Sequence, residues 1–473
     1  MHAMLNFTGK EEVFRFVSEN DIKILNLCHI PEVGKLKTLS FTAANRKRVF
    51  EILELGERVD GSNFFSFIEP GKSDIYIMPR LDRAFMNPFT KTPTINILCE
   101  YLDENGKPLD VSPRRVLARA EEKLRSTSDV VLKALVELEF YIVSKQKTEM
   151  LFLGEPDKNY QESAPFTSFE DLRNEVLVTL SKVGIATKYA HSEVGRILSK
   201  DGTLTEQQEV EFAPQNLADM AETVAIAKWV IRNICVKYGV SASFSPKVSI
   251  KHVGNGMHVH LCAIRKGKNI VADENGAVSV EAQKMIGGIL RFAPSLSAFG
   301  NPTPGSYLRF IAPKESPMNI YWSARDRLAL IRIPLWWSFR RAEEEIDICR
   351  ETFEYRAPDA LANTYLLLAG ITIAANYGLR NPEKALKIAE ELHIEETRDK
   401  RKQLKVLPHS CTESAENLEK DRQFYEVDGV FPKKLIDKTV EVLKSYKDKN
   451  LWKELTDKPD EIEDMLKQYL HCG

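Results

Sequence analysis

The chain has 473 residues, of which 43% are hydrophobic and 28% charged, proportions typical of a globular protein large enough for two or three domains. Lys and Arg total 66 against 68 for Asp and Glu. The resulting net charge of −2 argues against nucleic acid or another polyanion as a partner. The longest apolar run, residues 361–379, is interrupted by asparagines, so we interpret it as a buried helix rather than a membrane span.

The cysteines and the N-terminal residues indicate the compartment. The seven cysteines are scattered, odd in number and never spaced C-x-x-C, which is typical of reduced thiols. The first twenty residues become polar within a few positions and lack the apolar core of a signal peptide. We therefore expect a cytoplasmic protein that does not interact with membranes.

The first part of the chain alternates short helices and strands that end at turn-forming residues. The pattern predicts a small α+β domain over residues 1–110. Its expected helices are 10–20 and 46–55, and its expected strands are 22–30, 35–40, 73–78 and 94–102.

Residues 111–473 form a second predicted unit in which amphipathic helices again alternate with strands, so the fold class is α+β. Residues 145–168 are largely polar and predict a loop, and 301–305 are rich in helix breakers. From Pro382 onward the sequence is charged and helical, which predicts a solvated helical cap. The expected helices are 113–126, 169–184, 216–239 and 280–299, and the expected strands are 135–143 and 257–261.

The strand around Glu137 and Glu139 is the main chemical signal. Residues two apart on a strand point to the same face, roughly 7 Å apart, so these two carboxylates lie side by side. Leu138, Phe140 and their apolar neighbours occupy the other face. Two neighbouring carboxylates in a half-buried site repel each other, and a divalent cation between or beside them relieves this repulsion. A solvated strand face that happens to contain two glutamates is the alternative.

Similar pairs of polar residues, spaced by two, recur in other strand-like segments. They are Glu209 with Glu211, His258 with His260, and Glu354 with Arg356. A curved antiparallel sheet with a charged inner face would bring these residues together. Carboxylates with an imidazole suit Mg²⁺ or Mn²⁺ better than zinc.

Several motifs, in this order, resemble the glutamine synthetase family. The resemblance extends from about residue 15 to beyond residue 440. The motifs are Asp60-Gly61-Ser62, the V-E-L-E-F strand at 136–140, G-N-G-M-H-V-H at 254–260 and S-A-R-D-R-L-A-L-I-R-I-P at 323–334.

This resemblance implies a fold, a reaction and an assembly. The fold would be an N-terminal β-grasp domain followed by a catalytic domain with a curved antiparallel sheet. Subunits would form stacked rings, such as a dodecamer, with active sites between neighbouring subunits. ATP would phosphorylate the side-chain carboxylate of glutamate, and an amine, here ammonia, would then displace the phosphate.

The resemblance also implies two metal sites that hold Mg²⁺ or Mn²⁺. By similarity, Glu139, Glu193 and Glu209 would bind one ion, which positions the amino acid. Glu137, His258 and Glu354 would bind the other ion, which acts on the nucleotide phosphates. Glu193 enters this set from the resemblance alone.

Further roles follow by similarity. Arg327 and Arg332 would face the phosphates, His260 would contact the nucleotide, and Arg309 would bind the glutamate α-carboxylate. Gly254 and Arg356 would be further substrate contacts. Asp60 would come from an adjacent subunit to bind ammonium and accept its proton, and Glu315 would lie on a flap that excludes water.

The sequence departs from the family pattern at several positions near the substrates. Val253 replaces an asparagine near the glutamate amino group, and Gly305, Asp326 and Thr352 replace two asparagines and an arginine. A ligase that uses a larger amine therefore remains an alternative, although such relatives tend to lack Asp60-Gly61-Ser62. A non-catalytic family member is a third possibility, but it would be expected to lose metal ligands.

Overall fold

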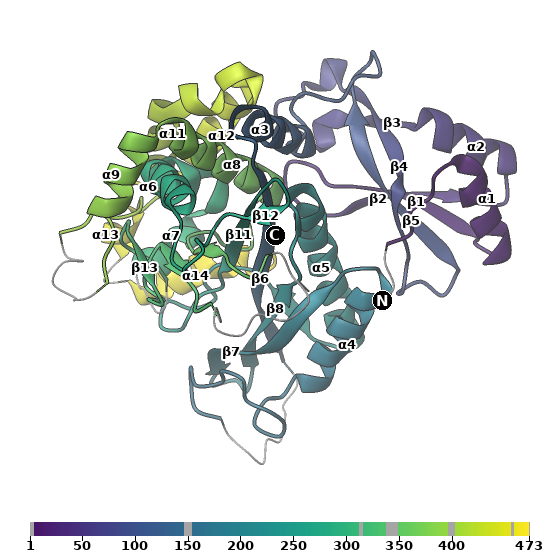
Figure 1. Cartoon of the computed structure of the whole chain (residues 1–473). Coiled ribbons are helices and arrows are strands. Elements are labelled where there is room, and N and C mark those ends of the chain that lie inside the picture. The colour runs from purple at the N-terminus through teal and green to yellow at the C-terminus, as the bar shows by residue number, and fades with distance from the viewer. Residues whose placement is uncertain are drawn as a thin grey trace.

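The computed structural model describes residues 4–145, 154–311, 316–336, 349–395, 403–455 and 458–472. Figure 1 shows a smaller N-terminal part beside a larger part that contains the remaining helices and strands. The two parts are built on separate sheets, each with its own apolar core. The domain boundary predicted at residues 110 and 111 stays a prediction.

The N-terminal part is a five-stranded sheet with the order β2-β1-β5-β4-β3. Its central strands β1 and β5 run parallel, and the other neighbouring pairs are antiparallel. Helices α1 and α2 pack on the sheet through buried aliphatic side chains. The bounds are α1 Lys10–Glu19, β1 Ile24–His29, β2 Lys37–Thr42, α2 Arg46–Leu55, β3 Glu57–Asp60, β4 Asp74–Met86 and β5 Thr94–Leu102.

The larger part is organised around a second sheet, in which ten strands pair among the described residues. Its main order is β13-β14-β15-β11-β6-β8-β7. Most neighbours are antiparallel, but β13 and β14 run parallel, so the sheet is mixed rather than wholly antiparallel as expected. The bounds are β6 Val131–Ser144, β7 Thr187–Leu198, β8 Leu204–Phe212, β9 Gln215–Asn216, β10 Ser241–Ser243, β11 Met257–Arg265, β12 Lys268–Asn269, β13 Trp322–Ala324, β14 Ile331–Ile333 and β15 Phe353–Tyr355.

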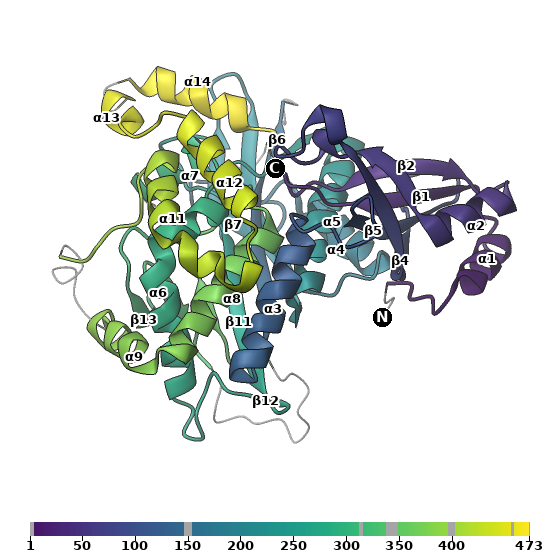
Figure 2. The same cartoon turned by 90° about the horizontal axis from the view of Figure 1, so that it is seen from above.

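Long buried helices and a helical C-terminal region surround this sheet (Figure 2). Residues 361–379 lie largely within the buried helix α8, as predicted, and the region after Pro382 is mainly helical. Among the described helices, none is both long and apolar enough to cross a bilayer. The bounds are α3 Pro113–Ser128, α4 Glu170–Lys182, α5 Leu217–Lys237, α6 Val280–Gly300, α7 Pro304–Ile311, α8 Thr364–Arg380, α9 Pro382–Glu391, α11 Cys411–Tyr425, α12 Lys433–Ser445, α13 Leu451–Leu455 and α14 Pro459–Tyr469.

A buried carboxylate joins the two parts. Glu222 on α5 is 1% exposed and pairs with Arg80 and Arg83, both on β4 of the N-terminal sheet, while Arg114 of α3 lies 3.5 Å away. Burial opposes ionisation of Glu222, but the arginines lower its pKa below the usual value. A charged group with these partners fixes the N-terminal sheet against α5.

Candidate active site

Strand β6 places Glu137 and Glu139 on one face of the large sheet, as the alternation of residue types predicted. Their neighbours Leu138 and Phe140 are fully buried on the opposite face. Cross-strand partners share a face, and Glu137 is paired with both Glu211 on β8 and His258 on β11. Glu139 is paired with Glu209 in the same way. The register of three adjacent strands therefore gathers these polar groups.

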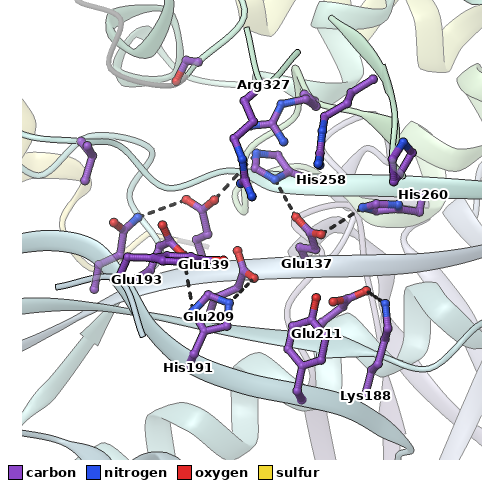
Figure 3. Close-up of a pocket in the computed structure, with 18 of the residues that line it drawn as sticks. Glu137, Glu139, Lys188, His191, Glu193, Glu209, Glu211, His258, His260 and Arg327 are labelled. Carbon is purple, nitrogen blue, oxygen red and sulfur yellow. Dashed lines mark hydrogen bonds and ion pairs between the residues drawn. The ribbon is translucent and has the colours of Figure 1, made fainter. Parts of the chain in front are cut away.

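These side chains line one cavity of about 300 Å³ (Figure 3). Its wall combines acids from β6, β7 and β8, histidines from β11 and arginines from the segments around β14 and β15. Most of the residues predicted for the site therefore meet in one place. The predicted residues in the wall are Glu137, Glu139, Glu193, Glu209, Gly254, His258, His260, Arg327, Arg332 and Arg356.

One group of potential metal ligands consists of Glu137, His260 and Glu354, whose ligand atoms lie within 4.8 Å of one another. The Nε2 atom of His260 is 3.0 Å from Glu137 Oε1. His258 also contacts Glu137, with its Nδ1 atom 3.0 Å from Oε2, and its Nε2 atom is 3.7 Å from Glu139 Oε1. His258 thus lies between Glu137 and Glu139, while His260 completes the group in this structure.

The second group consists of His191, Glu193 and Glu209, again with ligand atoms within 4.8 Å. His191 Nε2 is 3.1 Å from Glu209 Oε1, and its Nδ1 is 3.5 Å from Glu193 Oε2. Glu139 borders this group, but its Oε2 atom already accepts hydrogen bonds from the Gly256 amide at 2.7 Å and from Gln207 at 3.1 Å. These two donors fix the orientation of the Glu139 carboxylate.

Three acids in the cavity, Glu193, Glu209 and Glu137, have strongly perturbed pKa values. Burial and the nearby charges of Glu139 and Glu209 raise the pKa of Glu193 to about 9. Burial and neighbouring carboxylates likewise raise the pKa of Glu209 well above its usual value. Burial also opposes ionisation of Glu137, but the two adjacent histidines hold its pKa well below the usual value. The Glu193 side therefore has excess negative charge that protons or a cation must offset.

The residues of both groups fit divalent cations. Each group offers carboxylate oxygens and one imidazole nitrogen within a few ångströms, a donor set that suits Mg²⁺ or Mn²⁺. Burial, together with repulsion between neighbouring carboxylates, raises the pKa values of Glu193 and Glu209. A bound cation would remove this repulsion.

Arginines supply the positive charge of the cavity. Arg332 on β14 donates to Glu354 at 2.9 Å, and Arg356 pairs with the other oxygen of Glu354. The Nε atom of Arg332 is buried and has no hydrogen-bond partner among the described residues. An anionic ligand could satisfy this donor. Arg327 lies in the same wall, near His258 in Figure 3.

Two predicted residues, Arg309 and Asp60, lie elsewhere, and a third falls outside the described residues. Arg309 on α7 is only 2% exposed, donates to the carbonyls of Ala357 and Pro358, and is not among the described residues that line the cavity. Asp60 lies in the N-terminal part, where Ser62 and Asn63 donate to its carboxylate and lower its pKa. Glu315 falls outside the described residues.

The cavity also contains residues that the sequence did not single out. They come mainly from β7, a strand that was not predicted, and from the polar segment before α4. His191 lies two positions before Glu193, so the same period of two could have identified it. Lys188 donates to Glu211 at 2.7 Å, and the other oxygen of Glu211 is buried and unpaired among the described residues. The further wall residues include Tyr160, Lys188, Tyr189, His191 and Gln207, and they lie beside Glu211 and Val253, which the sequence had pointed to.

Fold and site together define an α+β protein with a β-grasp sheet and a second sheet whose acidic pocket can hold divalent cations. Family comparisons agree with this class. Residues 110–463 match the model described as "Glutamine synthetase, catalytic domain", and residues 21–104 match "Glutamine synthetase, beta-Grasp domain". The chain belongs to the glutamine synthetase family.

The similarity to known proteins extends over nearly the whole chain. A glutamine synthetase of Thermotoga maritima is 31% identical over 419 residues, covering 87% of this chain and 90% of that protein. A 3-hydroxylaminophenol mutase of Cupriavidus pinatubonensis is 28% identical over 462 residues, covering 91% and 94%. A cryo-EM structure of Plasmodium falciparum glutamine synthetase superposes with a TM-score of 0.78 at 19% identity, over 94% of this chain and 97% of that one. This structural likeness supports the fold alone.

Proposed function

We propose that the chain is an ATP-dependent ligase that joins ammonia to the side-chain carboxylate of glutamate through a γ-glutamyl phosphate. The observation that carries this proposal is the arrangement of two adjacent carboxylate–imidazole groups beside arginines at one cavity. Phosphoryl transfer depends mainly on positioning and on positive charge around the phosphates, which such a cavity can supply. Similar proteins named glutamine synthetase support the proposed substrates.

In this proposal the two groups hold Mg²⁺ or Mn²⁺. Glu193 and Glu209, with His191 and Glu139 beside them, would hold one ion, and Glu137 and Glu354, with the two histidines of β11, would hold the other. When bound, such ions neutralise negative charge on the nucleotide phosphates and the substrate carboxylate.

The arginines and the cavity wall would orient the substrates. Arg332 and Arg327 bind phosphate oxygens, while Arg356 and the Gly254 backbone border the amino acid. Arg309 would reach the α-carboxylate only after a change of its rotamer, because its guanidinium now donates to backbone carbonyls behind the wall. Glu315 would lie over the site and exclude water from the acyl phosphate.

The acceptor side would need a second copy of the chain. Asp60 lies on the N-terminal sheet and is not among the described residues of the cavity wall, so within one subunit it does not reach the metal groups. A neighbouring subunit in a ring would bring its Asp60 to the cavity to bind ammonium and accept its proton.

One observation favours a second candidate function. Val253 is an apolar residue in the cavity wall, at a position that would adjoin the amino acid. An apolar wall suits a larger amine or a different acid substrate better than ammonium and glutamate. The relative named 3-hydroxylaminophenol mutase also shows that names within this group of similar proteins differ.

Phosphate release from ATP with Mg²⁺ and glutamate tests the proposal, with ammonium compared against a panel of mono- and polyamines. We expect turnover with ammonium, and loss of that turnover in the Glu139→Ala variant. Turnover only with a larger amine would replace the first function with the second. If no acceptor supports turnover, both ligase functions are wrong.

A further inference from the structure

Helix α14 packs beside α7 and α13 (Figures 1 and 2). Its Ile462 and Leu466 form a small apolar cluster with Leu308 of α7 and Leu455 of α13, separate from the main core. Leu308 is the residue before Arg309 on α7. The position of α7 therefore depends directly on α14.

Helix α14 also holds the segment 244–256, which joins β10 to β11 and brings Gly254 to the cavity. The Oε1 atom of Glu463 accepts hydrogen bonds from the Ser249 hydroxyl at 2.9 Å and from the Ile250 amide at 3.1 Å. Hydrogen bonds to a charged acceptor are stronger than neutral ones, so this one side chain anchors the outer end of the segment.

Hydrogen bonds within the segment connect its two ends. The Asn255 amide donates to the Pro246 carbonyl at 3.0 Å, and the Asn255 side chain donates to the Ser245 carbonyl at 2.8 Å. Buried Lys247 donates to the carbonyl of His252. These bonds connect the part near Glu463 to the part that lines the cavity.

At the cavity the segment and α7 touch each other. A Cβ atom added to Gly254 would lie 2.4 Å from the Pro246 carbonyl oxygen and 2.7 Å from Cγ of Arg309. Only glycine fits so close an approach. Helix α14 thus contacts, from outside, both elements that meet at Gly254.

We infer that α14 is a positioning element for the Gly254 side of the cavity, with Glu463 as the positioning residue that anchors segment 244–256. This inference rests on the proposed function, in which the Gly254 side binds the amino acid. Glu463 is not among the described residues that line the cavity. Loss of its contact should therefore weaken amino-acid binding and leave the nucleotide end, formed by strands of the large sheet, largely unchanged.

The kinetic test compares Glu463→Ala, Glu463→Gln and Asp464→Ala with the wild-type chain. The glutamine retains an acceptor oxygen, and Asp464 is an exposed neighbour whose only ion pair is with Lys467 among the described residues. We expect Glu463→Ala to raise KM for glutamate about tenfold while KM for ATP and kcat change less than about threefold. Glu463→Gln should recover most of the loss, and Asp464→Ala should match the wild type. Equal changes in both KM values, or no change, would overturn the inference.

Hydrogen exchange of the peptide amides in residues 244–256 separates this inference from the proposed function. We expect faster exchange in Glu463→Ala than in the wild type, with Glu463→Gln and Asp464→Ala close to the wild type. If the wild-type chain does not act on glutamate, the proposed function fails but exchange still tests the anchor. Unchanged exchange in Glu463→Ala would show that Glu463 does not hold the segment.

Discussion

At Glu193 the environment predicts how stability depends on pH in the metal-free protein. Its pKa is about 9 in the folded chain because of burial and neighbouring carboxylates, and it returns to about 4.5 on unfolding. The folded state therefore binds the proton more tightly, and stability falls as pH rises from about 4.5 toward 9. We expect Tm in EDTA to fall by about 2–4 °C between pH 6 and pH 9, measured by calorimetry.

The matched variant is Glu193→Gln, which cannot ionise. Its Tm should vary less over the same pH interval, and addition of Mn²⁺ should raise Tm less than in the wild type because one ligand is lost. Parallel pH profiles for the wild type and the variant would contradict the proposed effect of Glu193.

Single residues of the site were predictable where a strand has a clear alternation of apolar and polar side chains. Glu137 and Glu139 alternate with buried Leu138 and Phe140, so their common face could be predicted. Lys188 could not be placed in the same way, because the first part of β7 has no regular alternation of apolar and polar residues and forms a strand by pairing with β8. Pairing between distant segments leaves little local signal.

Helices α6 and α8 meet through glycines, which makes their packing sensitive to one methyl group. A Cβ atom at Gly378 would lie 1.9 Å from the backbone oxygen of Lys284. Helix propensity alone favours alanine by about 1 kcal/mol, but overpacking against backbone costs about 1–3 kcal/mol and cannot be relieved by a rotamer change. We expect Gly378→Ala to lower the midpoint of urea unfolding.

The control for this substitution is Gly71→Ala, because no atom lies within 4 Å of the added Cβ and the residue has no positive φ. Its unfolding midpoint should stay close to that of the wild type. A Gly378→Ala chain as stable as this control would show that the two helices can separate at little cost.

Among the elements, the buried helix over residues 361–379 was predicted because its long apolar run leaves few other conformations. Helix α7 was missed, since its Pro304 and Gly305 were interpreted as helix breakers. Proline is well tolerated in the first turn of a helix, and Pro304 is the first residue of α7. The same residue type can therefore begin a helix or interrupt one, and packing against α14 favours the first outcome here.

At the scale of the whole molecule, the proposed site between subunits can be tested with mixed assemblies. Asp60→Ala and Glu139→Ala chains should each have little activity with ammonium. If one subunit provides Asp60 and its neighbour provides Glu139, mixed assemblies contain some sites free of both substitutions. With equal random mixing, activity should recover to about one quarter of the wild type. The measurement is glutamine formation after co-expression and purification through two different tags.

If both residues act within one subunit, every site in the mixture carries one of the substitutions, and no activity returns. A mixture of wild-type and Glu139→Ala chains serves as the control for exchange of subunits during assembly.

Strand β6 limits where residues can be inserted into this chain. It spans Val131–Ser144 and pairs with both β8 and β11. Because side chains alternate between the two faces of a strand, a shift by one residue exchanges the side chains that face the cavity with those that face the core. Insertion of a single codon before Glu137 would turn the acids toward the apolar core and the leucines toward the cavity. Insertions in the turn between β7 and β8 do not cause this shift. Tolerance of insertions should therefore be lowest along this one strand, a pattern that a library of single-residue insertions would reveal.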